Sequence, residues 1–243
     1  MTKLIKKILK PVLVYFFFVT LLFLKKLFNV RFSTVSAERI GDLAASCDLF
    51  IKKKIIYPNN DRVCFIVEPP SNKTLLKLIK KHIFTIESRF GKILINHSKQ
   101  KLINHDLYLS VREDHFAYKE YDTVPPQLSF SLNQTNTGFS QLKKIGISEK
   151  DWWVCFHVRD SQYLKKLYKN RDMSYHDYRD FSEESLHEGV IEVTKRGGFA
   201  ILMSEKDKSP KFKNNDLVVQ YNKNTFKSDF LDIFLAANAK FFI

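Results

Sequence analysis

The stretch Trp152-Trp-Val-Cys-Phe-His-Val-Arg-Asp160 joins an apolar run to an imidazole, a guanidinium and a carboxylate. Side chains alternate along a strand, so Cys155, His157 and Arg159 are expected on one face. Both faces of a parallel sheet are covered, and an unpaired arginine inside one would be costly. Arg159 and Asp160 come at the carboxyl end of the strand, where open α/β sheets form their ligand crevice. A planar, permanently charged guanidinium at that place suits a nucleotide diphosphate.

Residue types alone leave a structural explanation open for the same stretch. His157 can be a hydrogen-bonded core histidine, and Arg159 and Asp160 can be a surface ion pair where a strand ends. Other kinds of site find little support in the sequence, because it contains no Asp-x-Asp triplet, no Gly-x-Ser-x-Gly and no Gly-Lys-Ser/Thr. We therefore expect no metal site and no cofactor. Charge relief on a departing diphosphate is expected from Arg159, with Arg179 helping.

Around this stretch, buried-strand runs alternate with helical patterns, which is typical of an α/β layer with parallel strands. In the first half, Asn72 is a suitable N-cap for an amphipathic helix, and Ser182 and Ser228 are suitable caps in the second half. Expected strands are residues 63–67, 92–95, 154–158, 199–203 and 216–221, with another beginning at Lys240.

Composition divides the chain into four parts. Residues 1–28 are a basic, hydrophobic segment, and residues 29–124 are expected to form a first Rossmann-like domain. Residues 125–150, rich in proline, asparagine and glycine, are interpreted as a linker. Residues 151–243 are expected to form part of a second domain of the same kind.

The first part carries the charge excess of a chain whose net charge is +14. Residues 1–60 hold eleven Lys and Arg against three acidic residues, whereas residues 181–243 hold nine against nine. A nucleic-acid-binding domain would concentrate its positive charge on the folded core, so we expect no nucleic acid partner. The three cysteines are scattered and form no Cys-x-x-Cys pair. This pattern favours reduced thiols on the cytoplasmic side of a membrane.

Residues 11–24 are uncharged and strongly apolar. Lysines flank this run on both sides, at positions 3, 6, 7, 10, 25 and 26. A spanning helix needs about 20 apolar residues, and a shorter run fits an interfacial segment better. We interpret residues 1–28 as an uncleaved anchor in the headgroup region, with its lysines close to anionic lipid. A buried core helix is the alternative.

Five stretches resemble, in order, a family of bacterial putative glycosyltransferases associated with surface-polysaccharide synthesis. This family is similar to GT-B fucosyltransferases that carry an H-x-R motif. The matching stretches are residues 39–43 (Arg-Ile-Gly-Asp-Leu), 72–76 (Asn-Lys-Thr-Leu-Leu), 157–161 with Tyr163 (His-Val-Arg-Asp-Ser), 178–179 (Tyr-Arg), and 227–235 leading into 240–243.

The resemblance implies two Rossmann-like domains of GT-B type that face a cleft, with a nucleotide-sugar donor bound by the second. Carried over residue by residue, Arg159 grips a donor phosphate, with His157 and Asp160 in the same pocket. Tyr178 and Arg179 lie beside the donor on the loop after the strand.

The same resemblance implies that Arg39, Gly41 and Asp42 belong to a loop on the acceptor side. The family usually reads Arg-Ile-Gly-His-Leu there, so Asp42 replaces a histidine as the candidate general base. The family also continues beyond the position of Ile243, so the second domain is expected to be incomplete at its carboxyl end.

Together these observations predict a glycosyltransferase at the cytoplasmic face of the inner membrane, attached through residues 1–28. It would move a sugar from a nucleotide sugar to a surface-glycan or lipid-linked acceptor without a metal. Two alternatives remain: a truncated, inactive relative that acts as a membrane-associated scaffold, and a basic peripheral protein that binds anionic lipid without chemistry.

Overall fold

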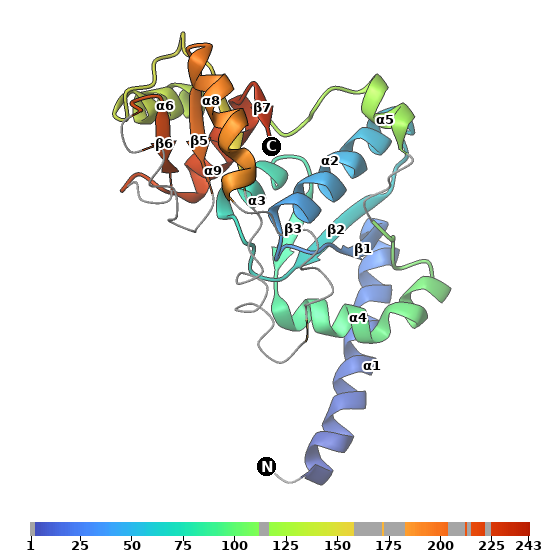
Figure 1. The fold of residues 1–243 in the computed structure, drawn as a ribbon. Coiled ribbons are helices and arrows are strands. Elements are labelled where there is room, and N and C mark those ends of the chain that lie inside the picture. The colour runs from blue at the N-terminus through green and yellow to red at the C-terminus, as the bar shows by residue number, and fades with distance from the viewer. Residues whose placement is uncertain are drawn as a thin grey trace. The chain divides into compact units, whose positions relative to one another are not determined.

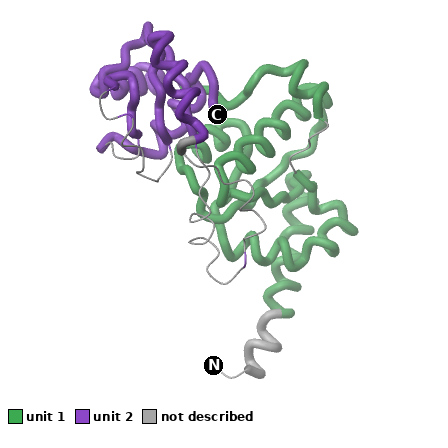
Figure 2. The backbone as a smooth tube through the Cα atoms, in the orientation of Figure 1, with its two compact units in different colours: residues 1–130 green, residues 131–243 purple. Residues whose placement is uncertain are grey.

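The computed structural model describes residues 3–111, 117–157, 172, 183–203, 212, 215–221 and 225–243. The chain is mixed α/β and divides into two compact units, residues 1–130 (unit 1) and residues 131–243 (unit 2) (Figure 2). Each unit is built on its own parallel sheet, labelled in Figure 1. The boundary falls inside residues 125–150, which the sequence suggested as a linker.

Unit 1 contains three parallel strands in the order β1-β2-β3. They are β1 (Val30–Thr34), β2 (Arg62–Val67) and β3 (Phe84–Glu87). Helix α2 (Ile40–Ile56) connects β1 to β2, and α3 (Lys73–Ile79) connects β2 to β3. After α4 (Arg89–Asn104) the chain returns to the free side of β1, where Tyr108 forms a parallel bridge with Phe32. The strand order therefore reverses at β1, as in one half of a doubly wound fold.

Alternation along the strands gives the sheet of unit 1 two apolar faces. Phe32, Cys64 and Ile66 are buried in one cluster with residues of α4 and with Phe18 and Leu21 of α1 (Lys3–Phe28). The other face meets α2, where the rings of Phe50 and Phe65 lie 5.0 Å apart. Helices on both faces of the sheet are what a parallel arrangement requires. The last helix of this unit, α5 (Tyr118–Thr123), contacts α2.

Helix α1 confirms the expected N-terminal apolar helix, and its carboxyl-terminal half packs on unit 1. Asn29 ends it with a positive φ of 49° and donates its N–H to the Lys25 carbonyl at 2.8 Å, as a left-handed cap does. The Lys25 ammonium contacts the Asp106 carboxylate at 2.7 Å. This hydrogen bond, with Arg31 nearby, holds the pKa of Asp106 below its ordinary value.

Unit 2 repeats the strand order of unit 1. Its described strands are β4 (Trp153–Phe156), β5 (Phe199–Leu202), β6 (Val218–Gln220) and β7 (Phe241–Phe242), all parallel, in the order β6-β5-β4-β7. From β4 the chain builds outward through β5 to β6 and then returns to the other side of β4 as β7. The order reverses between β4 and β7.

Helices cover both faces of this second sheet as well. The 3-10 helix η2 (Glu183–Leu186) leads into α8 (His187–Lys195), whose Val190 packs on Val154 and Phe156. On the other side, Trp153 donates its indole N–H to the Leu235 carbonyl of α9 (Asp229–Asn238) at 3.0 Å.

Residues 132–143 of the suggested linker form helix α6 (Leu132–Lys143), which begins with a capping box between Ser131 and Gln134. This helix packs on α9: a Cβ added at Gly138 would lie 2.4 Å from the Phe234 ring. Phe139 contacts the same ring edge-on, with the ring centroids 5.4 Å apart. Only a glycine at position 138 allows this close approach of the two helices.

One expected strand is wrong. Residues 92–95 lie inside α4, which Ser88 begins by accepting a hydrogen bond from the Gly91 N–H at 2.9 Å. The strand of this region is instead β3, which begins at Phe84, eight residues before the first residue of the expected strand. The short run Ile-Leu-Ile has the composition of a strand, but burial continues at Ser98 and Leu102 with a helical spacing.

Candidate functional site

His157 directly follows β4, at the point where the strand order of unit 2 reverses. Its backbone N–H donates to the Ile243 carbonyl at 2.7 Å, and the Ile243 N–H donates to the Cys155 carbonyl at 2.9 Å. The imidazole lies near the Phe242 ring, with the centroids 6.3 Å apart. His157 thus stands at the carboxyl ends of the two strands between which doubly wound sheets bind their ligands.

The His157 imidazole is exposed at the surface, yet its pKa is below the ordinary value because the surrounding protein partly removes the ring from water. This shift favours the neutral ring, in which one nitrogen donates and one accepts a hydrogen bond. An anionic group beside it would favour the protonated form. This histidine is therefore suited to respond to a phosphate, although it is not by itself a fixed cation.

The other donor-side candidates, Arg159, Asp160, Tyr178 and Arg179, lie outside the described residues. Their positions relative to His157 remain a prediction from the sequence.

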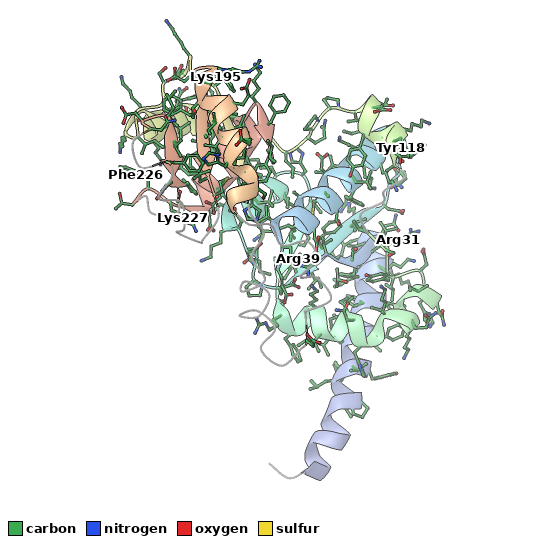
Figure 3. All side chains as sticks on the ribbon, in the orientation of Figure 1. Arg31, Arg39, Tyr118, Lys195, Phe226 and Lys227 are labelled. Carbon is green, nitrogen blue, oxygen red and sulfur yellow. The ribbon has the colours of Figure 1, made fainter. Side chains whose placement is uncertain are left out.

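Arg39, Gly41 and Asp42 lie together at the carboxyl end of β1, where the strand order of unit 1 reverses. Arg39 is the N-cap residue of α2 without a side-chain cap, and Asp42 lies in the first turn; Figure 3 labels Arg39 at the start of this helix. Gly41 is exposed, and a Cβ added there would meet open space. In the described part of the chain, no side chain pairs with the Arg39 guanidinium or the Asp42 carboxylate.

The β1–α2 loop that carries these residues is bound to neighbouring segments by hydrogen bonds. Glu68, buried to 5% exposure at the end of β2, accepts the Ala37 N–H at 2.7 Å. The Lys92 ammonium of α4 forms an ion pair with Glu68 and also donates to the Val35 carbonyl at 3.3 Å. On the opposite side of the loop, the Ser71 N–H donates to the Ala37 carbonyl at 2.7 Å. Three neighbouring elements therefore fix the loop in place.

The sequence interpretation missed Glu68 and Lys92. A carboxylate directly after a buried strand run, as at Glu68, is a signal that could have been noticed, because strand ends line the crevice. Lys92 could not be recognised, since it was assigned to a strand that does not form. Thr34 was also missed: its hydroxyl lies 3.0 Å from the Tyr108 hydroxyl and 3.2 Å from the Asn96 side-chain oxygen, beside the same reversal point.

Two hollows in unit 1 lie away from the β1–α2 loop that carries Arg39. One, of about 220 Å³, is lined by Arg31, Lys54 and Asp61 among others, near the amino-terminal end of β1. The other, of about 670 Å³, is a largely apolar groove between α1 and β3. Neither is lined by Asp42 or His157, so the candidate site is defined by strand order and by side chains.

Within the described ranges, no three His, Cys, Asp or Glu side chains gather closely enough to hold a metal ion. Comparison of the chain with protein families, with curated proteins and with solved structures found no match.

Proposed function

We propose that this protein is a glycosyltransferase that moves a sugar from a nucleotide-sugar donor to a surface-glycan or lipid-linked acceptor. In this proposal the two units are the Rossmann-like domains of a GT-B enzyme, with unit 2 on the donor side and unit 1 on the acceptor side.

The observation that carries the proposal is the strand order β6-β5-β4-β7 in unit 2. His157, the first residue of the H-x-R stretch, directly follows the strand at which the order reverses. Ligands of open α/β sheets bind outside the carboxyl ends of the strands at such a point. A histidine followed by an arginine is suited there to the phosphates of a nucleotide.

The chemistry follows from these roles. The acceptor hydroxyl attacks the anomeric carbon, the bond from that carbon to the diphosphate oxygen breaks, and the acceptor proton passes to a base. We propose the Asp42 carboxylate as this base, since it has no partner among the described side chains. The negative charge on the leaving diphosphate is met by Arg159 and Arg179, so that the reaction needs no metal.

We propose that the reaction takes place in a reducing compartment. Cys47, Cys64 and Cys155 are free and buried, which suits a reducing compartment and hence the cytoplasmic face of the inner membrane. Burial raises the pKa of Cys64 to about 11 and that of Cys47 and Cys155 to about 12. These thiols are inert, so we give them no part in the chemistry.

A panel of nucleoside diphosphates and nucleotide sugars tests the proposal on the full chain. One nucleoside diphosphate should raise the melting temperature of unit 2 by several degrees, because ligand at about 100 times its Kd adds about 2.7 kcal/mol of stability. The corresponding nucleoside without phosphates is the control. The matching nucleotide sugar should release its diphosphate when membrane glycolipid is added.

Each outcome of the panel has a distinct meaning. Binding without transfer would indicate an inactive relative of these enzymes. If no nucleoside diphosphate changes the melting temperature, the donor-site proposal is wrong.

A further inference from the structure

Helix α1 has two apolar sides, and only one of them is used inside unit 1. On the inner side, Phe18 and Leu21 are 5% and 3% exposed and belong to the core cluster with Phe32, Ile95 and Leu102. These contacts fix the carboxyl-terminal half of the helix to α4 and β1 (Figure 1).

The outer side of α1 is an apolar stripe that faces outward. It consists of Val12, Phe16, Val19, Phe23 and Leu27, spaced by three or four residues and therefore aligned on one side of the helix. All five are exposed, with Phe16 at 71% and Phe23 at 61%. We call this set the outer stripe. A contiguous exposed apolar surface of this kind indicates an interaction site and not an ordinary solvent-exposed surface.

The charges around the outer stripe identify its partner. The sequence has no acidic residue before Glu38, whereas lysines stand at both ends of the stripe. Lys26, three residues after Phe23 on the helix, is exposed. Apolar side chains bordered by cations match the interface of a bilayer that contains anionic lipid.

The packing of α1 also sets its orientation in that bilayer. By length and composition, residues 11–28 are sufficient to cross a membrane. A spanning helix, however, must be free of its own soluble domain through about 30 Å of hydrocarbon. Phe18 and Leu21, near the middle of α1, are packed in the core of unit 1. The part of α1 that precedes these core contacts, residues 3–14, is about 18 Å long. It is therefore too short to cross the hydrocarbon of a bilayer.

We propose that α1 lies in the plane of an anionic leaflet, with the outer stripe immersed and the opposite side docked on unit 1. At the carboxyl-terminal end of α1, the groove of about 670 Å³ adds further apolar surface, because Leu24 and Phe28 of α1 line it together with Phe84 and Ile86 of β3. Phe84 is largely exposed. The membrane-facing surface is therefore wider than the helix alone. This arrangement does not depend on glycosyl transfer.

Flotation of the full chain with vesicles of phosphatidylcholine and phosphatidylglycerol tests the stripe. The Phe16→Ser/Phe23→Ser double variant should lose about tenfold or more of its vesicle partition, because two large apolar side chains no longer enter the interface. The matched control is Leu132→Ser/Ile191→Ser, which removes two exposed apolar side chains from unit 2. It should float like the natural chain. Equal partition of the stripe variant and the control would overturn the proposal.

Depth measurements test the orientation with variants that are easier to fold. Single cysteines at Val12, Val19 and Leu27 can be labelled with a fluorophore, since the three natural cysteines are buried. Quenching by lipids brominated at different depths should give the same shallow depth at all three positions. A spanning helix would instead give depths that differ by about 20 Å between positions 12 and 27. Such a gradient, or the absence of quenching, would refute the in-plane arrangement.

Discussion

The Arg159→Ala variant is expected to bind the proposed nucleoside diphosphate at least 100-fold more weakly than the natural chain. A guanidinium makes two parallel, charge-assisted hydrogen bonds to phosphate oxygens, and each such bond contributes about 1.5–3 kcal/mol. Alanine removes both bonds and the charge without adding bulk at a strand end. Titration calorimetry on the full chain gives the ratio of the two Kd values, and the far-UV circular dichroism should be unchanged.

Arg196→Ala is the matched control for this experiment. Arg196 is also an exposed arginine of unit 2, and its guanidinium pairs with Glu192 at 2.6 Å. It caps the carboxyl-terminal end of α8, just before β5 begins. It therefore lies at the amino-terminal ends of the strands, whereas His157 lies at their carboxyl-terminal ends. Its loss should leave the Kd unchanged. Equal weakening by both substitutions would mean that the ligand responds to net charge rather than to a site after β4.

The second large effect is expected from Lys92→Met, which should lower the free energy of unfolding of unit 1 by roughly 3 kcal/mol. Glu68 is almost fully buried, and without the Lys92 ammonium the Ala37 N–H is the one partner that its carboxylate keeps among the described residues. Removing one member of a buried ion pair costs about 3–5 kcal/mol, and partial exposure of Lys92 places the effect at the lower end. Loss of the ion pair should also loosen the β1–α2 loop that carries Arg39 and Asp42, so the proposed glycosyl transfer should fall as well.

Hydrogen exchange at residues 35–39 is the suitable measurement for this variant, because both tryptophans lie in unit 2 and do not report on unit 1. Lys80→Met provides the control: Lys80 pairs with Glu87 at 2.7 Å on the surface, where such pairs contribute about 0–1 kcal/mol. Adding Glu68→Gln to Lys92→Met keeps an acceptor for Ala37 without a charge and should restore most of the protection. A loss no larger than that of Lys80→Met would contradict the role given to this pair.

Local signals predicted much of the fold correctly. The side chains of Asn72 and Ser228 cap α3 and α9 as expected, accepting hydrogen bonds from Leu75 and Leu231. The compact run at residues 63–67 is the central strand of unit 1. Each of these features depends on a few neighbouring residues, which is why one sequence suffices to identify them.

Features that depend on distant residues were not predictable in the same way. The place of α6 follows from the contact of Gly138 with Phe234, almost a hundred residues later in the chain. The buried pair of Glu68 and Lys92 requires β2 and α4 to be adjacent, and α4 itself was partly taken for a strand. For α1, an uncharged apolar run cannot reveal that Phe18 and Leu21 are docked while Phe16 and Phe23 are not.

For the candidate site, the sequence located the strand, but β4 ends at Phe156, two residues before the expected end at position 158, and the structure adds the strand order. His157 was expected within the strand and instead directly follows it, and the neighbour of that strand, β7, could not be known from the sequence. Arg39 and Asp42 were grouped by resemblance alone, and they lie together at the start of α2.

We propose that a nucleoside diphosphate binds beside His157, and an NMR titration of the His157 imidazole can detect it there. In the free protein the pKa of His157 lies below its ordinary value because the ring is partly removed from water. A bound diphosphate should raise that pKa, so the complex takes up protons and affinity increases as the pH falls between the two pKa values. His97 on α4 is the control resonance and should not move. A His157 resonance and pKa that stay unchanged at saturating diphosphate would show that no diphosphate binds beside this residue.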